Sequence, residues 1–121
     1  YPGVFSKLRE MFEREEAKGV PSLTDADFPG KVLHASKAVA VLFSSPTCPT
    51  CRFFKPRFRE LADRIGDDAD FYEMDIVSNE AWRKYDVLSI PTVLVFRAGE
   101  VVGRFTALPK VDDIEKLLYG K

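Results

Sequence analysis

Two cysteines are the residues of this chain whose type and spacing could do chemistry. Cys48 and Cys51 are the only cysteines among 121 residues, and Pro49 and Thr50 separate them. Thiols three positions apart at the start of a helix lie on the same face, where they can form a disulfide with each other. The pair therefore predicts dithiol–disulfide exchange, a chemistry that needs no cofactor beyond the two sulfur atoms.

The segments around the pair assign a role to each thiol. Residues 38–43 form a continuous apolar run, which predicts a strand covered on both faces, and residues 44–47 form a turn. Cys48 then stands at the start of a helix, where unpaired backbone N–H groups and the helix dipole favour a thiolate. We expect Cys48 to be the nucleophile and Cys51 to resolve the mixed disulfide. The helix has an apolar stripe of Phe54, Phe58, Leu61 and Ile65, and we expect a kink at Pro56.

Two other interpretations of the cysteine pair stay open at this point. The pair could be a structural disulfide, or it could supply half of a zinc site. Zinc needs more ligands than two thiolates, and the remaining soft ligand is His34, which we expect on another helix. We assign His34 no role and predict no metal.

A second feature is Pro91, which follows Ile90 directly at the entrance to the apolar run 92–96. Proline cannot donate a hydrogen bond to a β-ladder, so a proline at this place calls for an explanation. Taken alone, the residue favours a trans proline at the start of a strand, because cis bonds are a minority even before proline.

The other segments predict an α/β order of elements. Residues 4–18 have the spacing of an amphipathic helix, and Thr24 can cap a short helix that reaches about Leu33. A brief strand is predicted around residues 20–23. The remaining predictions are a strand at 71–76, a helix at 79–85 capped by Ser78, a hairpin of 92–96 and 101–105 around Gly99, and a helix at 111–119.

With these elements the chain resembles the thioredoxin family over roughly residues 22 to 119. The matching segments are 23–28, the motif 48–51, Pro56, 85–92 and the turn at 99–100. The resemblance implies a thioredoxin fold, with a central mixed sheet flanked by helices, as domain 22–121, preceded by a helical extension over 1–21. It also implies that Pro91 is cis and packs against the redox pair. Thr47, Ile90 and Pro91 would then bind substrate, with the backbone of Ile90 pairing with an extended segment.

Five positions depart from the family pattern. Leu42 lies where typical members carry a buried acid that assists the second cysteine, so we expect slower resolution of the mixed disulfide. Ser44 and Thr47 replace tryptophans, which makes the groove less aromatic. Pro49 and Thr50 replace Gly-Pro, and we expect these redox-tuning residues to place the reduction potential above the roughly −270 mV of ordinary thioredoxin.

The charge pattern narrows the range of partners. Eighteen basic and nineteen acidic side chains are interleaved, which excludes a strong attraction to nucleic acid, and no apolar run reaches the roughly 18 residues that span a bilayer. The leading hypothesis is a cytoplasmic reductase of protein disulfides, served by a thioredoxin-reductase-like electron donor. A protein disulfide oxidase or isomerase, a non-catalytic interaction module, and an exported or anchored form stay as alternatives. The apolar stripe of residues 4–18, with Phe5, Leu8 and Phe12, predicts packing on the domain or a homodimer contact.

Overall fold

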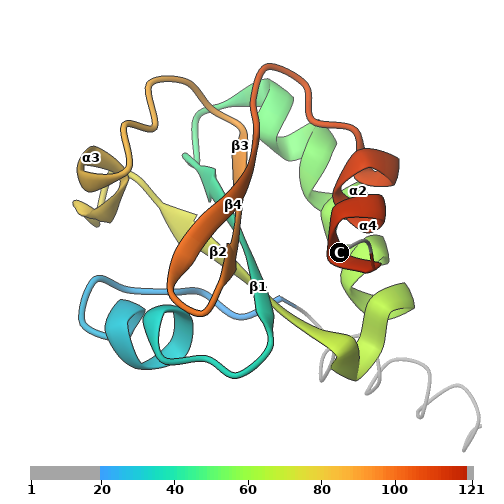
Figure 1. Cartoon of the computed structure of the whole chain (residues 1–121). Helices are drawn as coiled ribbons and strands as arrows, with labels where there is room; N and C mark the ends of the chain where they lie inside the picture. Colours follow the sequence, from blue (N-terminus) through green and yellow to red (C-terminus); the bar gives the residue numbers. More distant parts are fainter. Residues whose placement is uncertain (1–19, 120–121) are drawn as a thin grey trace, which may run out of the picture.

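The computed structural model of the protein describes residues 20–119, with a four-stranded sheet at its centre (Figure 1). The strand order is β2-β1-β3-β4, in which β1 is parallel to β2 and antiparallel to β3, and β3 is antiparallel to β4. This confirms the predicted α/β class with a mixed sheet flanked by helices. The strands are Ala38–Ser44 (β1), Ala69–Asp75 (β2), Thr92–Arg97 (β3) and Glu100–Phe105 (β4). The helices are Pro29–Leu33 (η1), Pro49–Ile65 (α2), Gly66–Asp68 (η2), Ala81–Lys84 (α3) and Val111–Tyr119 (α4).

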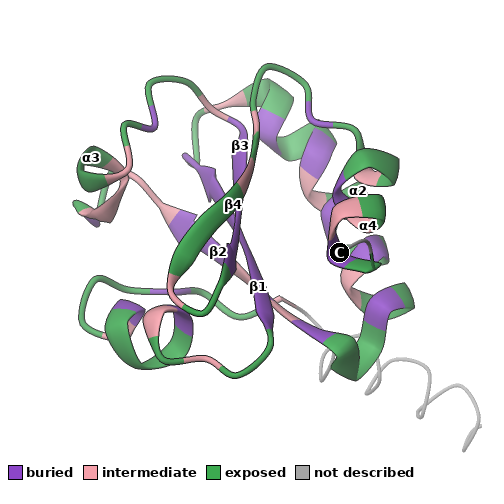
Figure 2. Ribbon diagram, in the orientation of Figure 1, coloured by how far each residue is buried: buried purple, intermediate pink, exposed green. Residues whose placement is uncertain are grey.

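Helices cover both faces of the sheet, which explains why the sequence of β1 lacks polar alternation. All seven residues of β1 are buried (Figure 2). Side chains alternate across a strand, so Ala40 and Leu42 belong to the core cluster under α2 and α4, whereas Val41 and Phe43 belong to the cluster on the other face. Helix η1 packs on that second face, because its Val32 is buried in the same cluster as Val41 and Phe43. Helix α3 lies on the same side of the sheet in Figure 1.

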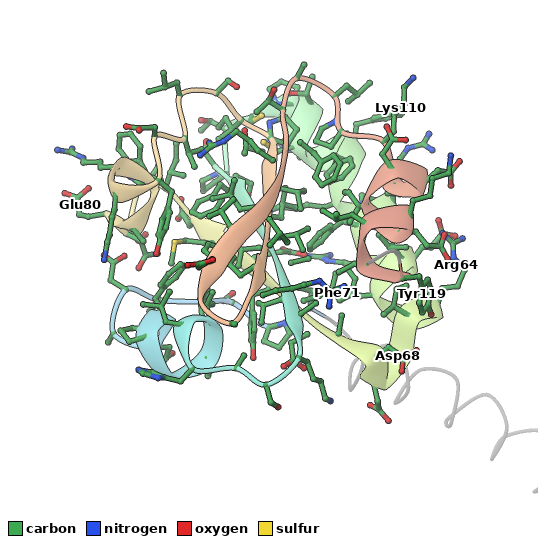
Figure 3. The ribbon with its side chains drawn as sticks, in the orientation of Figure 1. Arg64, Asp68, Phe71, Glu80, Lys110 and Tyr119 are labelled. Carbon is green, nitrogen blue, oxygen red and sulfur yellow. The ribbon has the colours of Figure 1, made fainter. Side chains whose placement is uncertain are left out.

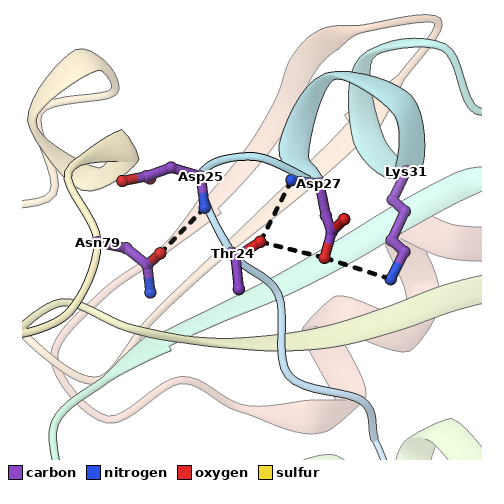
Figure 4. Close-up of polar contacts among 5 residues, drawn as sticks. All are labelled: Thr24, Asp25, Asp27, Lys31 and Asn79. Atoms are coloured by element: carbon purple, nitrogen blue, oxygen red, sulfur yellow. Dashed lines mark hydrogen bonds and ion pairs between the residues drawn. The ribbon is translucent and has the colours of Figure 1, made fainter.

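The segment before η1 forms less regular structure than expected. Residues 20–23 make only an isolated parallel bridge, between Ser22 and Glu73, instead of a strand. Thr24 does cap the following turn, because its Oγ1 accepts a hydrogen bond from the backbone N–H of Asp27 at 3.3 Å (Figure 4). The helix that follows is a short π-helix.

The prediction that Ser78 caps a helix over 79–85 is wrong. Helix α3 begins at Ala81, and its free backbone N–H groups are capped from a distant part of the chain. The carboxylate of Asp25 accepts from Glu80 N at 2.7 Å and from Ala81 N at 2.9 Å. The side-chain oxygen of Asn79, Oδ1, accepts a hydrogen bond from the backbone N–H of Asp25 at 3.0 Å (Figure 4). Ser78 instead donates to a carboxylate oxygen of Asp75.

The other expected elements agree closely with the structure. Helix α4 has the predicted bounds, and the hairpin of β3 and β4 turns at Gly99. Pro56 lies inside α2, and the kink expected there stays a prediction. The predicted amphipathic helix 4–18 lies outside the described residues. Between residues 20 and 119, no helix is long and apolar enough to cross a membrane.

Candidate active site

Cys48 occupies the N-cap position of α2, directly after the loop that leaves β1. Its backbone is extended, with φ −95° and ψ 109°, so no preceding helical turn supplies carbonyl partners to the first N–H groups of α2. The Sγ atom of Cys48 accepts a hydrogen bond from one of them, the N–H of Cys51, at 3.2 Å. Pro49 fits the first helical position because no backbone N–H is needed there. The local sequence therefore aims helix N–H groups at one sulfur atom.

Thr50 adds a second polar contact to the same sulfur. Its Oγ1 lies 3.2 Å from Sγ of Cys48, and the hydroxyl is necessarily the donor when Cys48 is a thiolate. Partial burial raises the pKa of Cys48, but the hydrogen bonds from Cys51 and Thr50 outweigh it, so the pKa of this thiol is lowered from its ordinary value. The site favours ionisation of Cys48.

Cys51 has the opposite environment. Its side chain is fully buried, and both cysteines are free thiols. Burial, together with the hydrogen bond with Cys48, raises the pKa of Cys51 from 9.0 to about 11, although the backbone of Ser45 and the charge of Lys55 oppose the change. Cys51 therefore keeps its proton while Cys48 is ionised.

Leu42 places a hydrocarbon side chain where the family resemblance implies an acid that assists Cys51. The side chain is fully buried in the core cluster that α2 covers. In the strand register, Leu42 stands beside Glu73 on β2. Both carboxylate oxygens of Glu73 accept from Arg59, at 2.8 and 2.9 Å, so this acid is neutralised by a bidentate ion pair. Among the described residues, no carboxylate is among the groups that shift the pKa of Cys51.

Hydrogen bonds fix the loop between β1 and the redox pair. The hydroxyls of Ser45 and Thr47 lie 3.2 Å apart, and the backbone N–H of Thr47 donates to Ser45 Oγ. The carbonyl of Ser45 accepts from the N–H of Cys48 at 3.3 Å. Thr47, Pro49 and Thr50 are exposed, so the face around Cys48 is open to a partner protein.

Pro91 lies at the same end of the sheet as the redox pair. Thr92 pairs with Phe43 in the register of β1 and β3, so the start of β3 stands beside the end of β1 (Figure 1). Pro91 is buried and its bond to Ile90 is cis, as the resemblance implies. Ile90 is half-buried in the same loop. The topology thus brings together the candidate substrate-binding residues of two distant segments.

Exposed apolar residues in the active-site helix and its neighbouring loops were not predicted as site residues. Phe53 is 55% exposed, Leu108 is 54% exposed and Leu88 is 89% exposed. Helical periodicity could have predicted that Phe53 is exposed, because Phe53 lies outside the apolar stripe that begins with Phe54. His34 is exposed at the end of η1, and residues 20–119 contain no group of three or more His, Cys, Asp or Glu side chains that could hold a metal ion.

Comparison with known proteins agrees with this geometry. The thioredoxin family model matches residues 19–119. The chain is 31% identical over 100 residues to a thioredoxin of Staphylococcus epidermidis and 32% identical over 100 residues to one of Staphylococcus aureus, in each case over 82% of this chain and 94% of the relative. It is also 30% identical over 110 residues to the chloroplastic M-type thioredoxin of Brassica napus, over 87% of this chain. The match covers only 62% of that longer protein.

The match spans the sheet, the helix that carries both cysteines and the loop of the cis proline. The family model covers all of the described residues, and the match covers the staphylococcal relatives almost end to end. Both findings agree with the thiol pair and its electrostatics. The chain therefore belongs to the thioredoxin family of thiol–disulfide oxidoreductases.

Proposed function

We propose that the chain reduces disulfides of other proteins by cycling Cys48 and Cys51 between dithiol and disulfide. The observation that carries the proposal is the opposite electrostatic treatment of the two thiols within one helical turn. The pKa of Cys48 is lowered, whereas that of Cys51 is raised to about 11. A nucleophile must be ionised to attack, and a resolving thiol must stay protonated until the mixed disulfide exists.

The cycle transfers two electrons from the protein to its substrate. The Cys48 thiolate attacks one sulfur of the substrate disulfide, forms a mixed disulfide and releases the other substrate sulfur as a thiolate that takes up a proton. Cys51 then loses its proton and attacks Sγ of Cys48. The second substrate thiolate leaves, the substrate is reduced, and the Cys48–Cys51 disulfide remains. A thioredoxin-reductase-like donor returns two electrons to this disulfide.

The proposed roles of the surrounding residues follow from their place in the site. Thr47, Ile90 and Pro91 hold the substrate segment beside Cys48, with backbone hydrogen bonds at Ile90. Pro49 and Thr50 tune the potential, which we expect to lie above the roughly −270 mV of ordinary thioredoxin. Equilibration with a glutathione buffer measures it, and a value at or below that figure contradicts the expectation.

The proposal extends to partners and location. Disulfide-containing proteins are the substrates, and the setting is cytoplasmic. Residues 1–21 form a helical extension to the thioredoxin-like domain 22–121, and its apolar stripe packs on the domain or joins two copies as a homodimer. Light scattering of the full chain at several concentrations tests the homodimer, because a constant monomer mass contradicts it.

A second candidate function is oxidation or isomerisation of disulfides in folding proteins. It is favoured by Leu42, which supplies no base to Cys51, and by the Pro49-Thr50 pair. Slow resolution lengthens the life of the mixed disulfide, which suits isomerisation more than rapid reduction. A non-catalytic interaction module is disfavoured by the two free thiols at the helix start.

Insulin reduction by dithiothreitol tests the proposal with Cys48→Ser and Cys51→Ser variants. We expect Cys48→Ser to fall to the uncatalysed rate, because no thiolate attacks. Cys51→Ser should turn over poorly and accumulate a mixed disulfide with the substrate, visible by mass spectrometry. Undiminished turnover in both variants would favour a binding module. Efficient refolding of a scrambled-disulfide protein with negligible insulin reduction would favour the isomerase.

A further inference from the structure

We propose that a cleft beside the redox pair binds an acidic and apolar segment of the substrate protein, adjacent to the disulfide that is reduced. The inference rests on the proposed reductase function and adds a substrate preference to it. It stands on three observations, which are the shape of the cleft, the charges that line it, and its position relative to Cys48.

The cleft lies between α2 and the loop that leads into α4. Its volume is about 280 Å³. Two of its apolar side chains, Phe53 and Leu108, are each more than half exposed. An apolar group that enters a cleft between exposed apolar side chains removes their surface and its own from water, which makes binding favourable in free energy. The lining residues are Phe53, Phe54, Arg57, Leu108, Pro109 and Lys110.

Both charged residues that line the cleft are cations. Arg57 stacks on the open aromatic ring, with its Cζ atom 4.5 Å from the centroid of Phe53. Lys110 stands at the opposite wall, just before α4 (Figure 3). Within residues 20–119, neither side chain makes an ion pair, whereas other surface cations such as Arg64 do. Asp112 and the residue after it lie in the first turn of α4 but do not line the cleft.

The cleft is close enough to the redox pair for one peptide segment to reach both. Phe53 follows Cys48 by five residues, which is a rise of about 7 Å and a rotation of about 140° around a helix axis, or roughly 10 Å between the two side chains. The loop that carries Leu108 starts after Phe105, whose register partner is Val93, two residues beyond Pro91. That loop therefore runs from the cis-proline end of the sheet to α4, and it lines the cleft together with α2. An extended substrate segment covers the interval in about two to four residues.

These features select the chemistry of the occupant. Carboxylates match the two cations, which make no ion pair with another residue of 20–119, and an aromatic or branched aliphatic side chain matches Phe53 and Leu108. A basic segment would meet like charges at both walls. The occupant is therefore a substrate segment with Asp or Glu next to a large apolar residue, two to four positions from the reacting cysteine.

A set of peptide substrates tests the preference. The peptides share one cyclic disulfide and one phenylalanine, and they differ in carrying two glutamates, two glutamines or two lysines beside it. For the unmodified chain we expect kcat/KM to be roughly fivefold higher for the glutamate peptide than for the glutamine peptide, because two exposed ion pairs contribute modestly. The lysine peptide should be the poorest substrate, and 0.5 M salt should reduce the ratios.

Variants assign the preference to the cleft. In the double variant Arg57→Gln with Lys110→Gln, the glutamate-to-glutamine ratio should fall to near one. Lys37→Gln is the control for loss of charge elsewhere, because it removes one positive charge, against two in the double variant, from an exposed position just before β1, at the opposite end of that strand from the redox pair. This control should keep the full ratio, since the strand separates it from the cleft by about 20 Å.

The outcomes separate this inference from the proposed function. Reduction of bis(2-hydroxyethyl) disulfide by the unmodified chain reports on the redox pair alone, and its absence would contradict the reductase. Equal rates for the three peptides, or the same loss of ratio in Lys37→Gln as in the double variant, would overturn the cleft proposal while leaving the reductase intact. A ratio that falls with protein concentration would instead assign the cleft to a second copy of the chain and would also overturn it.

Discussion

The start of helix α2 and the buried turn that follows it each carry a cysteine thiol, and they shift the pKa of that thiol in opposite directions. At the start, Cys48 is partly open to solvent and accepts hydrogen bonds, so its thiolate is stabilised. One turn later, Cys51 is fully buried and its pKa is raised to about 11. The difference shows that position along the helix, and not the residue type, decides which thiol attacks and which one waits.

The contrast also shows where the chemistry is incomplete. Hydrogen-bond donors serve the first thiol, but the described residues place no base beside the second one. The family resemblance implies an acid at Leu42, and in this chain that position holds a hydrocarbon side chain that is fully buried in the core cluster under α2.

Leu42→Asp should have the largest effect, because it would supply Cys51 with a base. General-base assistance contributes about 10²-fold to 10⁴-fold in favourable cases, and we expect resolution of the mixed disulfide to accelerate at least tenfold. A buried carboxylate that replaces a well-packed leucine should also lower the free energy of unfolding by about 3 kcal/mol. Single-turnover release of a reduced peptide, together with guanidinium unfolding, measures both quantities.

Leu42→Asn is the matched control for this change. It has nearly the same shape as aspartate and carries a similar desolvation cost, but it cannot accept the proton of Cys51. We therefore expect a comparable loss of stability without faster resolution. If the two variants resolve the mixed disulfide at the same rate, the missing acid is not what limits the second step.

Local sequence patterns were sufficient to predict most of the elements that position the site. The unbroken apolar run of β1 indicated a strand covered on both faces, and the spacing in 111–119 gave α4 with its observed bounds. Both signals are local, since each depends on the periodicity of one segment. The same reasoning extended to Cys48, because a helix N-terminus has free N–H groups in any fold.

Contacts between distant segments could not be predicted in this way. Asp25 caps α3 from 55 positions away, so the first residue of that helix depends on tertiary structure that no local pattern contains. The approach of Lys110 to the cleft likewise depends on how the loop before α4 crosses α2. The stacking of Arg57 on Phe53, in contrast, joins residues four positions apart on one helix and is a local contact. Family resemblance, and not residue spacing, implied the cis bond before Pro91.

The stability of the reduced protein should depend on pH with opposite signs for the two thiols. The pKa of Cys48 is lowered in the folded state, so its contribution grows as pH rises from the folded pKa toward the unfolded value. The pKa of Cys51 is raised from 9.0 to about 11, so its contribution is complete below pH 9 and is lost between pH 9 and 11. We expect about 2 kcal/mol of stability to disappear in that alkaline interval.

Thermal or guanidinium unfolding across pH 6 to 11 measures this dependence, and the oxidised protein is its control. In the disulfide form neither sulfur titrates, so both contributions vanish while every other ionisable group remains. The difference between the reduced and oxidised curves isolates the two thiols. A difference that stays level above pH 9 would show that Cys51 ionises normally and that burial does not hold its proton.

Thr50→Val should produce the smallest effect, and it tests how much the hydroxyl of Thr50 stabilises the thiolate of Cys48. Valine keeps the branched shape of threonine but removes the hydroxyl that lies 3.2 Å from Sγ of Cys48. The pKa of Cys48 should rise, and the thiolate fraction at pH 7 should fall about threefold, in line with the loss of one hydrogen bond to a charged group that is partly exposed. The rate of iodoacetamide alkylation at pH 7 reports that fraction.

Thr50→Ser separates the hydroxyl from the shape of the side chain. Serine retains the donor and loses only a methyl group, so its alkylation rate should match that of the unmodified chain. At pH 10 the thiolate is fully formed in all three proteins and their rates should converge, because the hydroxyl changes how much thiolate exists more than how fast it reacts. Equal alkylation rates at pH 7 for valine and serine would mean that the backbone N–H of Cys51 and the helix start stabilise Cys48 without help from Thr50.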